Sequence, residues 1–120
     1  MRTGDLNRRI AFQVRAATKD SFGQQVTTWS TLLASVPANI AALAGRELLA
    51  AQAANAEVTH EITVRYHPKL ANPTAVAAMR AVYVDVRHGI TRVFELATAR
   101  NVEEKNRWLV ISASEGLTAG

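Results

Sequence analysis

The segment from residue 40 to residue 66 constrains the fold more than any other part of the chain, because its hydrophobic period changes twice. An apolar strand ends shortly before Gly45, and nearly every residue from 46 to 56 is a helix former. Glu47 would lie in the first helical turn, where the helix dipole favours a carboxylate. From residue 58 to residue 66 the period returns to two, which is typical of a strand with one buried face. The sequence therefore predicts one short helix inserted between strands.

The strand at residues 58–66 has the clearest alternation in the chain. One face would carry Val58, His60, Ile62, Val64 and Tyr66, and the other Thr59, Glu61, Thr63 and Arg65. The preceding helix contrasts with it, since Leu48 and Leu49 are its only large apolar residues. An isolated helix of about 12 residues is marginal in water, so this helix must pack on the sheet or on another subunit.

The rest of the chain predicts a series of short strands. We expect them at residues 8–15, 24–30, 38–43, 81–87, 92–99 and 108–113, with turns at residues 19–23 and 88–89. Residues 31–36 have no clear assignment, and Pro37 marks an edge or a bend. Residues 101–106 form a connection, and residues 67–78, which lack a period, form a long loop. The expected fold is mainly β: a small β-barrel or sandwich of six to seven short antiparallel strands with one short α-helix inserted.

These elements predict one folded domain at residues 8–115, between a flexible N-terminal arm at residues 1–7 and a C-terminal tail at residues 116–120. At 120 residues the chain has room for a single core. It has no cysteine, which excludes disulfides and thiolate metal sites, and no apolar run approaches the ~18 residues of a membrane span. The N-terminus lacks the apolar segment of a signal peptide, so we expect a soluble protein made in a cytoplasm.

The charge of the chain is mildly basic. A formal net charge of +4, from 14 basic and 10 acidic residues, allows contact with nucleic acid or with an acidic protein surface. The basic residues are scattered, and Arg8 and Arg9 form the only adjacent pair, whereas a dedicated DNA binder has a denser patch. A small β-barrel that binds single strands remains an alternative, although its aromatic residues do not gather with basic residues on one face.

No catalytic constellation is apparent in the sequence. His60 lies on the apolar face of its strand, as a hydrogen-bonded core histidine would, and His67 and His88 occupy turn positions. Their spacing matches no zinc motif. Glu103 and Glu104 fall in a polar connection, and the chain has neither a nucleophile elbow nor a phosphate-binding glycine loop. We therefore expect no enzyme activity, no metal, no cofactor and no small-molecule substrate.

A set of short motifs occurs in a fixed order between about residue 4 and residue 116. They are GDLNRRIAFQ at residues 4–13; Asp20, Phe22 and Gly23 followed by Val26 and Trp29; Ala38, Ile40, Gly45 and Glu47; HEITVRY at residues 60–66; Arg80; Arg92 with Phe94; and Glu115. In this order and spacing the chain resembles the phage head–tail joining family, the head-closure or stopper proteins of tailed bacteriophages and gene transfer agents. One departure is the high alanine content of residues 41–56.

The resemblance implies a structural virion protein with a β-barrel core, assembled in the host bacterial cytoplasm and located at the head–tail junction. It implies a homo-oligomeric ring, commonly a dodecamer, with a portal and adaptor ring above it and the tail or a tail terminator protein below it. The ring would close the head after packaging, retain double-stranded DNA in its channel and provide the surface to which the tail attaches. Another ring protein of the same junction, a tail terminator or tail completion protein, is the alternative.

The resemblance also implies which residues carry this role. In similar proteins a segment between the early and middle strands projects into the channel as a gate, and residues 45–57 match it by position. The candidate gating or subunit-contact residues are Gly45, Arg46, Glu47, Leu48, Leu49, Gln52 and Asn55. The candidate basic residues that face DNA or a neighbouring subunit are Arg8, Arg9, Arg65 and Arg80.

Overall fold

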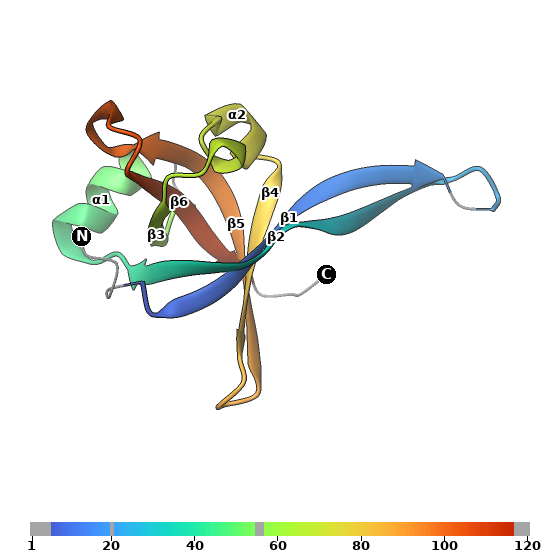
Figure 1. Ribbon diagram of the computed structural model, residues 1–120, viewed down its shortest axis with the longest axis horizontal. Helices are drawn as coiled ribbons and strands as arrows, with labels where there is room; N and C mark the ends of the chain where they lie inside the picture. The colour runs from blue at the N-terminus through green and yellow to red at the C-terminus, as the bar shows by residue number, and fades with distance from the viewer. Residues whose placement is uncertain (1–5, 20, 55–56, 117–120) are drawn as a thin grey trace.

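The chain folds into a six-stranded antiparallel β-barrel from which several elements project (Figure 1). The computed structural model describes residues 6–19, 21–54 and 57–116. Around the barrel the strands follow the order β1-β2-β3-β6-β5-β4, and β4 closes onto β1. The elements are β1 Arg8–Lys19, β2 Gln25–Ala42, α1 Gly45–Ala54, β3 His60–Arg65, η2 Pro68–Leu70, α2 Pro73–Val76, β4 Met79–Asp85, β5 Ile90–Asn101, η3 Val102–Glu104 and β6 Trp108–Gly116. The predicted mainly-β fold with an inserted helix is confirmed.

The core fills the inside of the barrel with side chains from all six strands. Phe12 from β1 and Phe94 from β5 are its largest members, and both are completely buried. Ile62 and Val64, which were predicted to face inward from β3, are completely buried too. Burying an apolar side chain of this size stabilises the fold by about 1.5–3 kcal/mol relative to leaving it exposed. The alternation along β3 therefore identified part of the core correctly.

Two hairpins continue beyond the barrel wall. β4 pairs with β1 only from Ile10 to Val14, so residues 15–19 and 25–29 form a two-stranded ribbon. With residues 21–24 at its tip, this ribbon is here called the β1–β2 extension. Residues 84–91 lie beyond the last pair that β4 makes with β1 and form a second ribbon, the β4–β5 extension. The two ribbons leave the barrel in different directions (Figure 1), and the molecule measures 48 × 34 × 28 Å along its principal axes.

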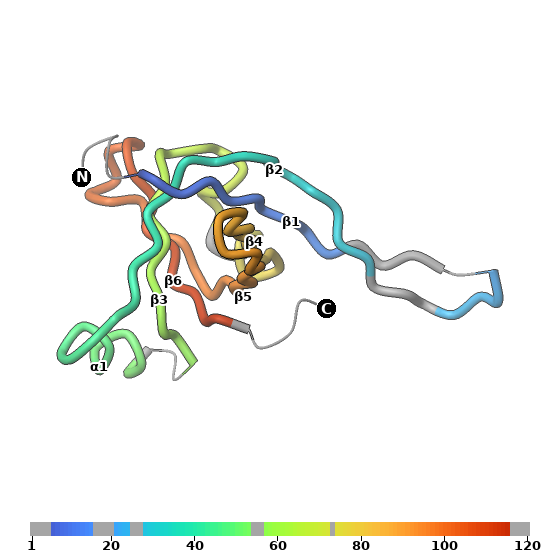
Figure 2. Tube along the Cα trace, turned by 90° about the horizontal axis from the view of Figure 1, so that it is seen from below, coloured from blue at the N-terminus to red at the C-terminus, as the bar shows by residue number. Residues whose placement is uncertain are grey.

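Helix α1 is the third projecting element. It lies at the end of the molecule opposite the β1–β2 extension, as Figures 1 and 2 show from two directions. The chain enters and leaves it through neighbouring segments, because Leu43 N donates to Thr59 O at 3.0 Å. None of the described residues of α1 is buried, so the helix does not contribute to the core.

The prediction of separate strands at residues 24–30 and 38–43 was wrong. β2 is one continuous strand that includes residues 31–36 and Pro37. Pro37 lies opposite Arg9 of β1, and the pairs between β2 and β3 begin one residue later, at Ala38. A missing N–H donor is tolerated at the end of a ladder. β1, β5 and β6 are likewise longer than expected, because hairpin pairing extends them beyond their apolar repeats.

The prediction of a long loop at residues 67–78 was also wrong in part, because the short helices η2 and α2 lie there. His67 Nδ1 accepts a hydrogen bond from Lys69 N at 3.1 Å at the start of η2. Asn72 Oδ1 accepts from Thr74 N at 3.0 Å at the start of α2. Such caps satisfy the first N–H groups of a helix, and they allow Leu70 and Val76 to reach the core.

The remaining predicted boundaries differ by small amounts or concern residues that the structure does not describe. β3 is shorter than the predicted strand at residues 58–66, and α1 begins at Gly45 rather than at residue 46. Asp20 of the predicted turn and Asn55 of the candidate gating segment lie outside the described residues. So do residues 1–5 and 117–120, and the division into an N-terminal arm, one domain and a tail stays a prediction.

Candidate assembly surfaces

Among the described residues, the large apolar side chains that stay exposed all lie on the three projecting elements. Phe22 at the tip of the β1–β2 extension is 89% exposed, and Leu49 on α1 is 70% exposed. Val86 in the β4–β5 extension is 86% exposed, and Val84 and Ile90 are exposed beside it in the same ribbon. Clustered apolar groups on a protein surface mark places where another molecule binds, and the β4–β5 extension carries such a group, whereas Phe22 and Leu49 are each the single exposed large apolar residue of their element. The projections are therefore the first candidates for contact surfaces.

The β1–β2 extension is fixed to the barrel by a stack of cationic and aromatic side chains at its base. The guanidinium of Arg80 lies 4.3 Å from the centre of the Trp29 ring, and that of Arg15 lies 5.2 Å from it. Arg80 Nε also donates to Gln13 Oε1 at 2.7 Å. A cation over an indole ring is attracted by about 0.5–1 kcal/mol at exposed sites. Arg80 of β4 thus holds the base of the β1–β2 extension against the barrel.

Helix α1 has the composition of a contact element rather than of a core element. Gly45 takes a φ of +58°, a conformation that glycine adopts without strain, and so sets the direction in which the helix leaves β2. Leu48 is half-buried and Leu49 points outward. Gln52 Nε2 donates to Val58 O at 3.2 Å and ties the helix to the segment before β3. Arg46 and Glu47 in the first turn are exposed.

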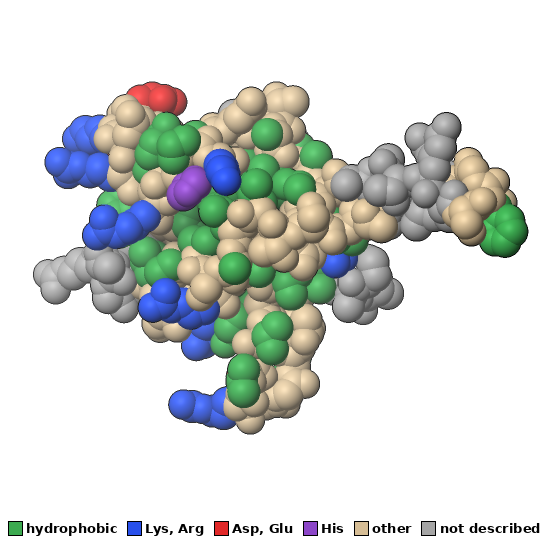
Figure 3. Space-filling view, turned by 45° about the vertical axis from the view of Figure 1, so that its right-hand side comes forward, with side chains coloured by type: hydrophobic (Ala, Val, Ile, Leu, Met, Phe, Trp, Pro, Cys, Tyr) green, Lys and Arg blue, Asp and Glu red, His purple; other side chains and the backbone are tan. Residues whose placement is uncertain are grey.

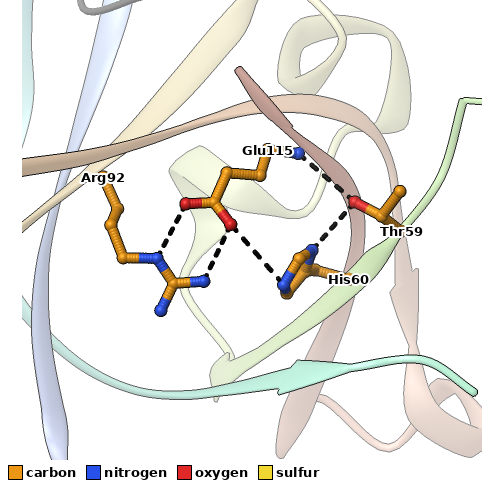
Figure 4. Close-up of polar contacts among 4 residues, drawn as sticks. All are labelled: Thr59, His60, Arg92 and Glu115. Atoms are coloured by element: carbon orange, nitrogen blue, oxygen red, sulfur yellow. Dashed lines mark hydrogen bonds and ion pairs between the residues drawn. The ribbon is translucent and has the colours of Figure 1, made fainter. Parts of the chain in front are cut away.

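A polar cluster joins three strands near the C-terminal end of β6 (Figure 4). Arg92 of β5 makes a bidentate pair with Glu115 of β6, with Nε–Oε2 at 2.8 Å and Nη2–Oε1 at 2.9 Å. His60 of β3 lies on the other side of the carboxylate, with Nε2 3.8 Å from Oε1. The His60 ring meets Phe94 edge-on at 5.3 Å between centroids. The cluster thus connects the ends of β3, β5 and β6 at the margin of the core.

The hydrogen bonds of Thr59 fix the orientation of the histidine. Thr59 Oγ1 accepts from Glu115 N at 3.3 Å and lies 2.8 Å from His60 Nδ1. Because the Glu115 carboxylate lies 3.8 Å from Nε2, we assign the ring proton to Nε2, and Nδ1 then accepts from the Thr59 hydroxyl. His60 was predicted to be a hydrogen-bonded core histidine; it is hydrogen-bonded, but it lies at the margin of the core, where its side chain is 13% exposed.

Electrostatics in this cluster favour a neutral histidine beside a charged pair. Burial lowers the pKa of His60, and it outweighs the raising effect of the Glu115 carboxylate. Hydrogen bonds from Arg92 lower the pKa of Glu115, and the same bonds raise the pKa of Arg92. A threonine, a histidine and a carboxylate in a row resemble a nucleophile with its base. Here, however, the carboxylate is bound by Arg92, so the arrangement stabilises the fold.

Two open clefts hold two of the four candidate basic residues, Arg65 and Arg8. A cleft of about 480 Å³ at the end of the β3–β6 ladder is lined by Arg65, Tyr66, Asn106, Arg107 and Trp108. A cleft of about 320 Å³ at the base of the β4–β5 extension is lined by Arg8, Tyr83, Asp85, Arg87 and His88. In each of them a guanidinium lies over an aromatic ring, Arg65 over Trp108 at 5.6 Å and Arg8 over Tyr83 at 5.7 Å.

The four predicted basic residues do not form one patch. Arg8 and Arg65 lie in different clefts, Arg9 is exposed on β1 opposite Pro37, and Arg80 is half-buried at the base of the β1–β2 extension. Figure 3 shows the Lys and Arg side chains of one face spread in separate positions. Their arrangement resembles a lightly basic surface rather than a nucleic-acid-binding groove.

The part of the chain that the structure describes contains no group of three or more His, Cys, Asp or Glu residues placed to hold a metal ion. Within the same residues, no helix is long and apolar enough to span a membrane. Asp85 already has hydrogen-bond partners within its own turn. Its carboxylate accepts from His88 N at 3.3 Å and lies 2.9 Å from His88 Nδ1. The hydrogen bond with the His88 side chain lowers the pKa of Asp85.

Sequence reasoning missed how the residues of the family-like motifs come together. Arg92 and Glu115, from separate motifs, form one ion pair, and His60 lies beside them. Trp29 and Arg80, also from separate motifs, form the stack at the base of the β1–β2 extension. These contacts can be found only once the pairing of the strands is known. The one signal in the sequence is an arginine between apolar residues of a strand, which indicates a partner on another strand.

Comparisons with known proteins give one family and two similar structures. A family model described as phage head completion protein matches residues 1–116. The solution structure of protein SF1141 from Shigella flexneri 2a has a TM-score of 0.71 at 23% identity, covering 98% of this chain and 98% of that chain. A chain in the virion of a native gene transfer agent particle has a TM-score of 0.52 at 18% identity, covering 93% of this chain and 96% of that chain. No curated protein matches the sequence.

Proposed function

Because the chain belongs to the phage head completion protein family and is a structural protein of a phage-type head, we propose that its copies form a ring at the head–tail junction. In this role the ring closes the head after DNA packaging and provides the surface to which the tail attaches. Its partners are further copies of itself, a portal or adaptor ring on the head side, a tail or tail terminator protein on the other side and the packaged double-stranded DNA. Assembly takes place in the bacterial cytoplasm.

The observation that carries this proposal is the distribution of exposed apolar residues. The barrel is closed and its core is filled, so the wall offers few free backbone groups. The exposed large apolar residues of the described chain lie on α1 and the two extensions, which leave the barrel in different directions. A subunit with separate projecting contacts can engage two neighbours and two further rings at the same time.

We assign the channel-facing or neighbour-facing role to the segment around α1. Its residues Gly45, Arg46, Glu47, Leu48, Leu49, Gln52 and Asn55 belong to a helix, or directly follow one, that contributes nothing to the core. Helices of this length need tertiary contacts for stability. A neighbouring subunit or a partner ring would supply contacts that the monomer lacks.

We assign contacts with a neighbouring subunit or with DNA phosphates to Arg8, Arg9 and Arg65, which are exposed. Scattered arginines hold a phosphate backbone without reading its sequence. Arg80 was expected in the same group, but its guanidinium is engaged by Trp29 and Gln13. We therefore assign it to holding the β1–β2 extension in place.

Particles produced without this protein test the proposal. We expect heads that have lost their DNA or that lack tails, visible by electron microscopy and by the nuclease sensitivity of the DNA. Complementation with the wild-type chain should restore both properties. Particles without the protein that stay filled with DNA and carry tails would show that the proposal is wrong. DNA-filled heads that lack tails, with the protein found on the tail, would favour the tail terminator.

A further inference from the structure

We propose that the β1–β2 extensions of neighbouring copies pair edge to edge, with β1 of one copy beside β2 of the next. This inference rests on the proposed ring and names the backbone edges by which its subunits meet. The edges concerned are residues 15–19 of β1 and residues 25–31 of β2. The pairing is antiparallel, and it continues the two-stranded ribbon of each copy into a sheet that the copies share.

Both strands of the extension are edge strands. β3 pairs with β2 only from Ala38 to Ala42, so from Gln25 to Val36 the only strand partner of β2 among the described residues is β1. β4 pairs with β1 only as far as Val14, which leaves residues 15–19 of β1 with β2 as their single partner strand in the described chain. The ribbon therefore projects from the barrel with a free edge on each side (Figure 1).

The free edge of β2 has none of the features that keep other strands away. Natural proteins protect an edge with charged side chains, a proline, a bulge or a short strand. β2 has 18 residues, and no Asp, Glu, Lys or Arg occurs from residue 24 to residue 45. Pro37 and the two shifts in register with β1 lie outside residues 25–31, which pair regularly with β1. These residues thus form a regular, uncharged edge, which is the form that accepts a further strand.

A ribbon of two strands also needs a further strand for its own stability. A two-stranded hairpin is marginally stable in water, and three or more strands are needed for independent stability. The stack of Trp29 with Arg15 and Arg80 fixes the base of the extension to the barrel. Beyond this base, the described residues supply the ribbon with no third strand. A strand added from outside would bind through main-chain hydrogen bonds, which the free edges offer.

A second copy of this chain is the occupant that satisfies both edges. Copies in a ring are related by rotation, so neighbouring extensions point the same way and β1 of one lies beside β2 of the next. Because β1 and β2 run in opposite directions within one ribbon, this contact between copies is antiparallel as well. The contact repeats from copy to copy, and when the ring closes each extension has a strand on both sides.

The charges of the two strands favour this contact over a two-fold one. β1 contributes Arg15 and Lys19 to the ribbon, whereas residues 25–31 of β2 carry no charge. Pairing β1 with β1 of another copy would bring like charges together across neighbouring strands, which is destabilising. Pairing β2 with β2 would leave both β1 edges free. A strand from a head-side or tail-side partner is the competing occupant, and it would likewise cover one edge only.

Hydrogen exchange of the backbone tests the proposal. An N–H group on a free edge exchanges rapidly with solvent, and a hydrogen bond to another strand slows its exchange. The exchange is measured by mass spectrometry in dilute purified protein and in particles. We expect the peptides that cover residues 15–19 and residues 25–31 to exchange more slowly in particles, by about tenfold. Residues 108–113 of β6 pair with a strand on both sides in the isolated chain and are the control that should not change.

Each outcome of this measurement decides the question. Slower exchange in both peptides supports pairing of β1 with β2 of the next copy. Slower exchange in only one of them would indicate a two-fold contact or a strand from a different protein, and unchanged exchange in both would show that the edges stay free; either result overturns the inference. If particles contain the protein and keep DNA and tails while both edges exchange as in dilute protein, the proposed function stands and this inference is wrong.

Proline variants at Ser30 and Thr31, which are both exposed, test whether the backbone makes the contact. Successive residues of an antiparallel strand direct their N–H groups to opposite sides, so one of these two faces β1 and the other faces the free edge. Proline removes the N–H group and is tolerated where that group points away from the sheet. We therefore expect one of Ser30→Pro and Thr31→Pro to melt within a few degrees of wild type and yet to enter particles about tenfold less. The other should lose stability.

Ser30→Ala and Thr31→Ala are the matched controls, because they keep the N–H group and should enter particles as wild type does. If the proline variant that keeps its stability enters particles as fully as wild type, the edge of β2 is not a contact and the inference is wrong. If both proline variants lose stability, the hydrogen exchange of the wild-type chain decides.

Discussion

Glu115 holds the end of β6 by binding two neighbours in different ways. The bidentate pair with Arg92 is charged and about one third exposed, whereas His60 on the other side is neutral and mostly buried. Exposed ion pairs contribute little to stability, but a bidentate pair with a fixed geometry lies at the upper end of that range. The cluster thus stabilises the closed barrel where β3, β5 and β6 meet.

Replacement of Arg92 by methionine tests the ion pair. We expect the variant Arg92→Met to lose up to about 1 kcal/mol of stability at neutral pH, which lowers the melting temperature by a few degrees. Arg92 makes the pKa of Glu115 lower in the folded chain than its ordinary value of 4.5. The stabilisation is therefore complete above pH 4.5 and is lost as the pH falls through the folded-state pKa. Melting curves of both proteins should converge in acid.

A matched control for this prediction is the exposed pair between Lys105 and Glu103, whose side chains are 61% and 68% exposed. Lys105→Met should leave the melting temperature unchanged. If the difference between wild type and Arg92→Met grew as the pH fell, Glu115 would not be the group that the arginine stabilises.

His60 gives the fold a second dependence on pH. Burial holds its pKa below 6.5, so on acidification the unfolded chain takes up the proton first. Stability should fall as the pH drops below 6.5 and continue to fall until the folded-state pKa is passed. The variant His60→Gln should lack this part of the slope. Urea unfolding between about pH 7.5 and about pH 5.5 measures it, and a wild-type protein that gained stability on acidification would contradict the prediction.

At the level of secondary-structure elements, some patterns in the sequence are local and others are not. The alternation in β3 identified Ile62 and Val64 as core residues, because a period of two needs no partner strand. The contact between Arg92 and Glu115 depends on the pairing of β5 with β6, which includes a shift in register between Leu96 and Thr98. A shift of this kind leaves no signal in a single strand. The continuity of β2 through Pro37 likewise depends on its two neighbours.

The role of helix α1 can be separated from its contribution to folding. The variant Leu48→Ala with Leu49→Ala removes the large apolar groups of the helix and keeps its propensity, since alanine is the best helix former. Because neither residue is in the core, we expect only a small change in melting temperature but a clear loss of assembly or DNA retention in particles. Thermal unfolding and the DNA content of particles are the two measurements.

Ile62→Ala is the control with the opposite profile, because Ile62 is completely buried in β3. It should cost about 2–5 kcal/mol of stability. If Leu48→Ala with Leu49→Ala unfolded the monomer to the same extent, α1 would be part of the core, and the assembly role assigned to it would be wrong.

In the molecule as a whole, the barrel contains the core that stabilises the fold, and the projections carry the proposed contact surfaces. Alternation and turn positions predicted a small β-barrel or sandwich, since they follow from which residues are buried, and the structure is a closed barrel. The sequence did not predict that two hairpins extend beyond the wall, because a residue such as Phe22 looks the same whether it lies in a core or at a tip. Its 89% exposure becomes evident only once the pairing of β1 with β4 is known to stop at Val14.

Shortening the β1–β2 extension tests this division. Arg15 and Trp29 face each other across the ribbon, so residues 16–28 can be replaced by Asn-Gly, which forms a two-residue hairpin turn. The core residues and the stack of Trp29 on Arg80 are kept. We therefore expect a cooperative unfolding transition with a melting temperature within a few degrees of wild type, but chains that no longer enter particles.

Phe94→Ala is the control for this variant, because it should lower the stability of the barrel by about 3–5 kcal/mol while it leaves the β1–β2 extension unchanged. A shortened chain that fails to fold would mean that the extension belongs to the folding unit, and one that still completes particles would remove it from the contact surfaces.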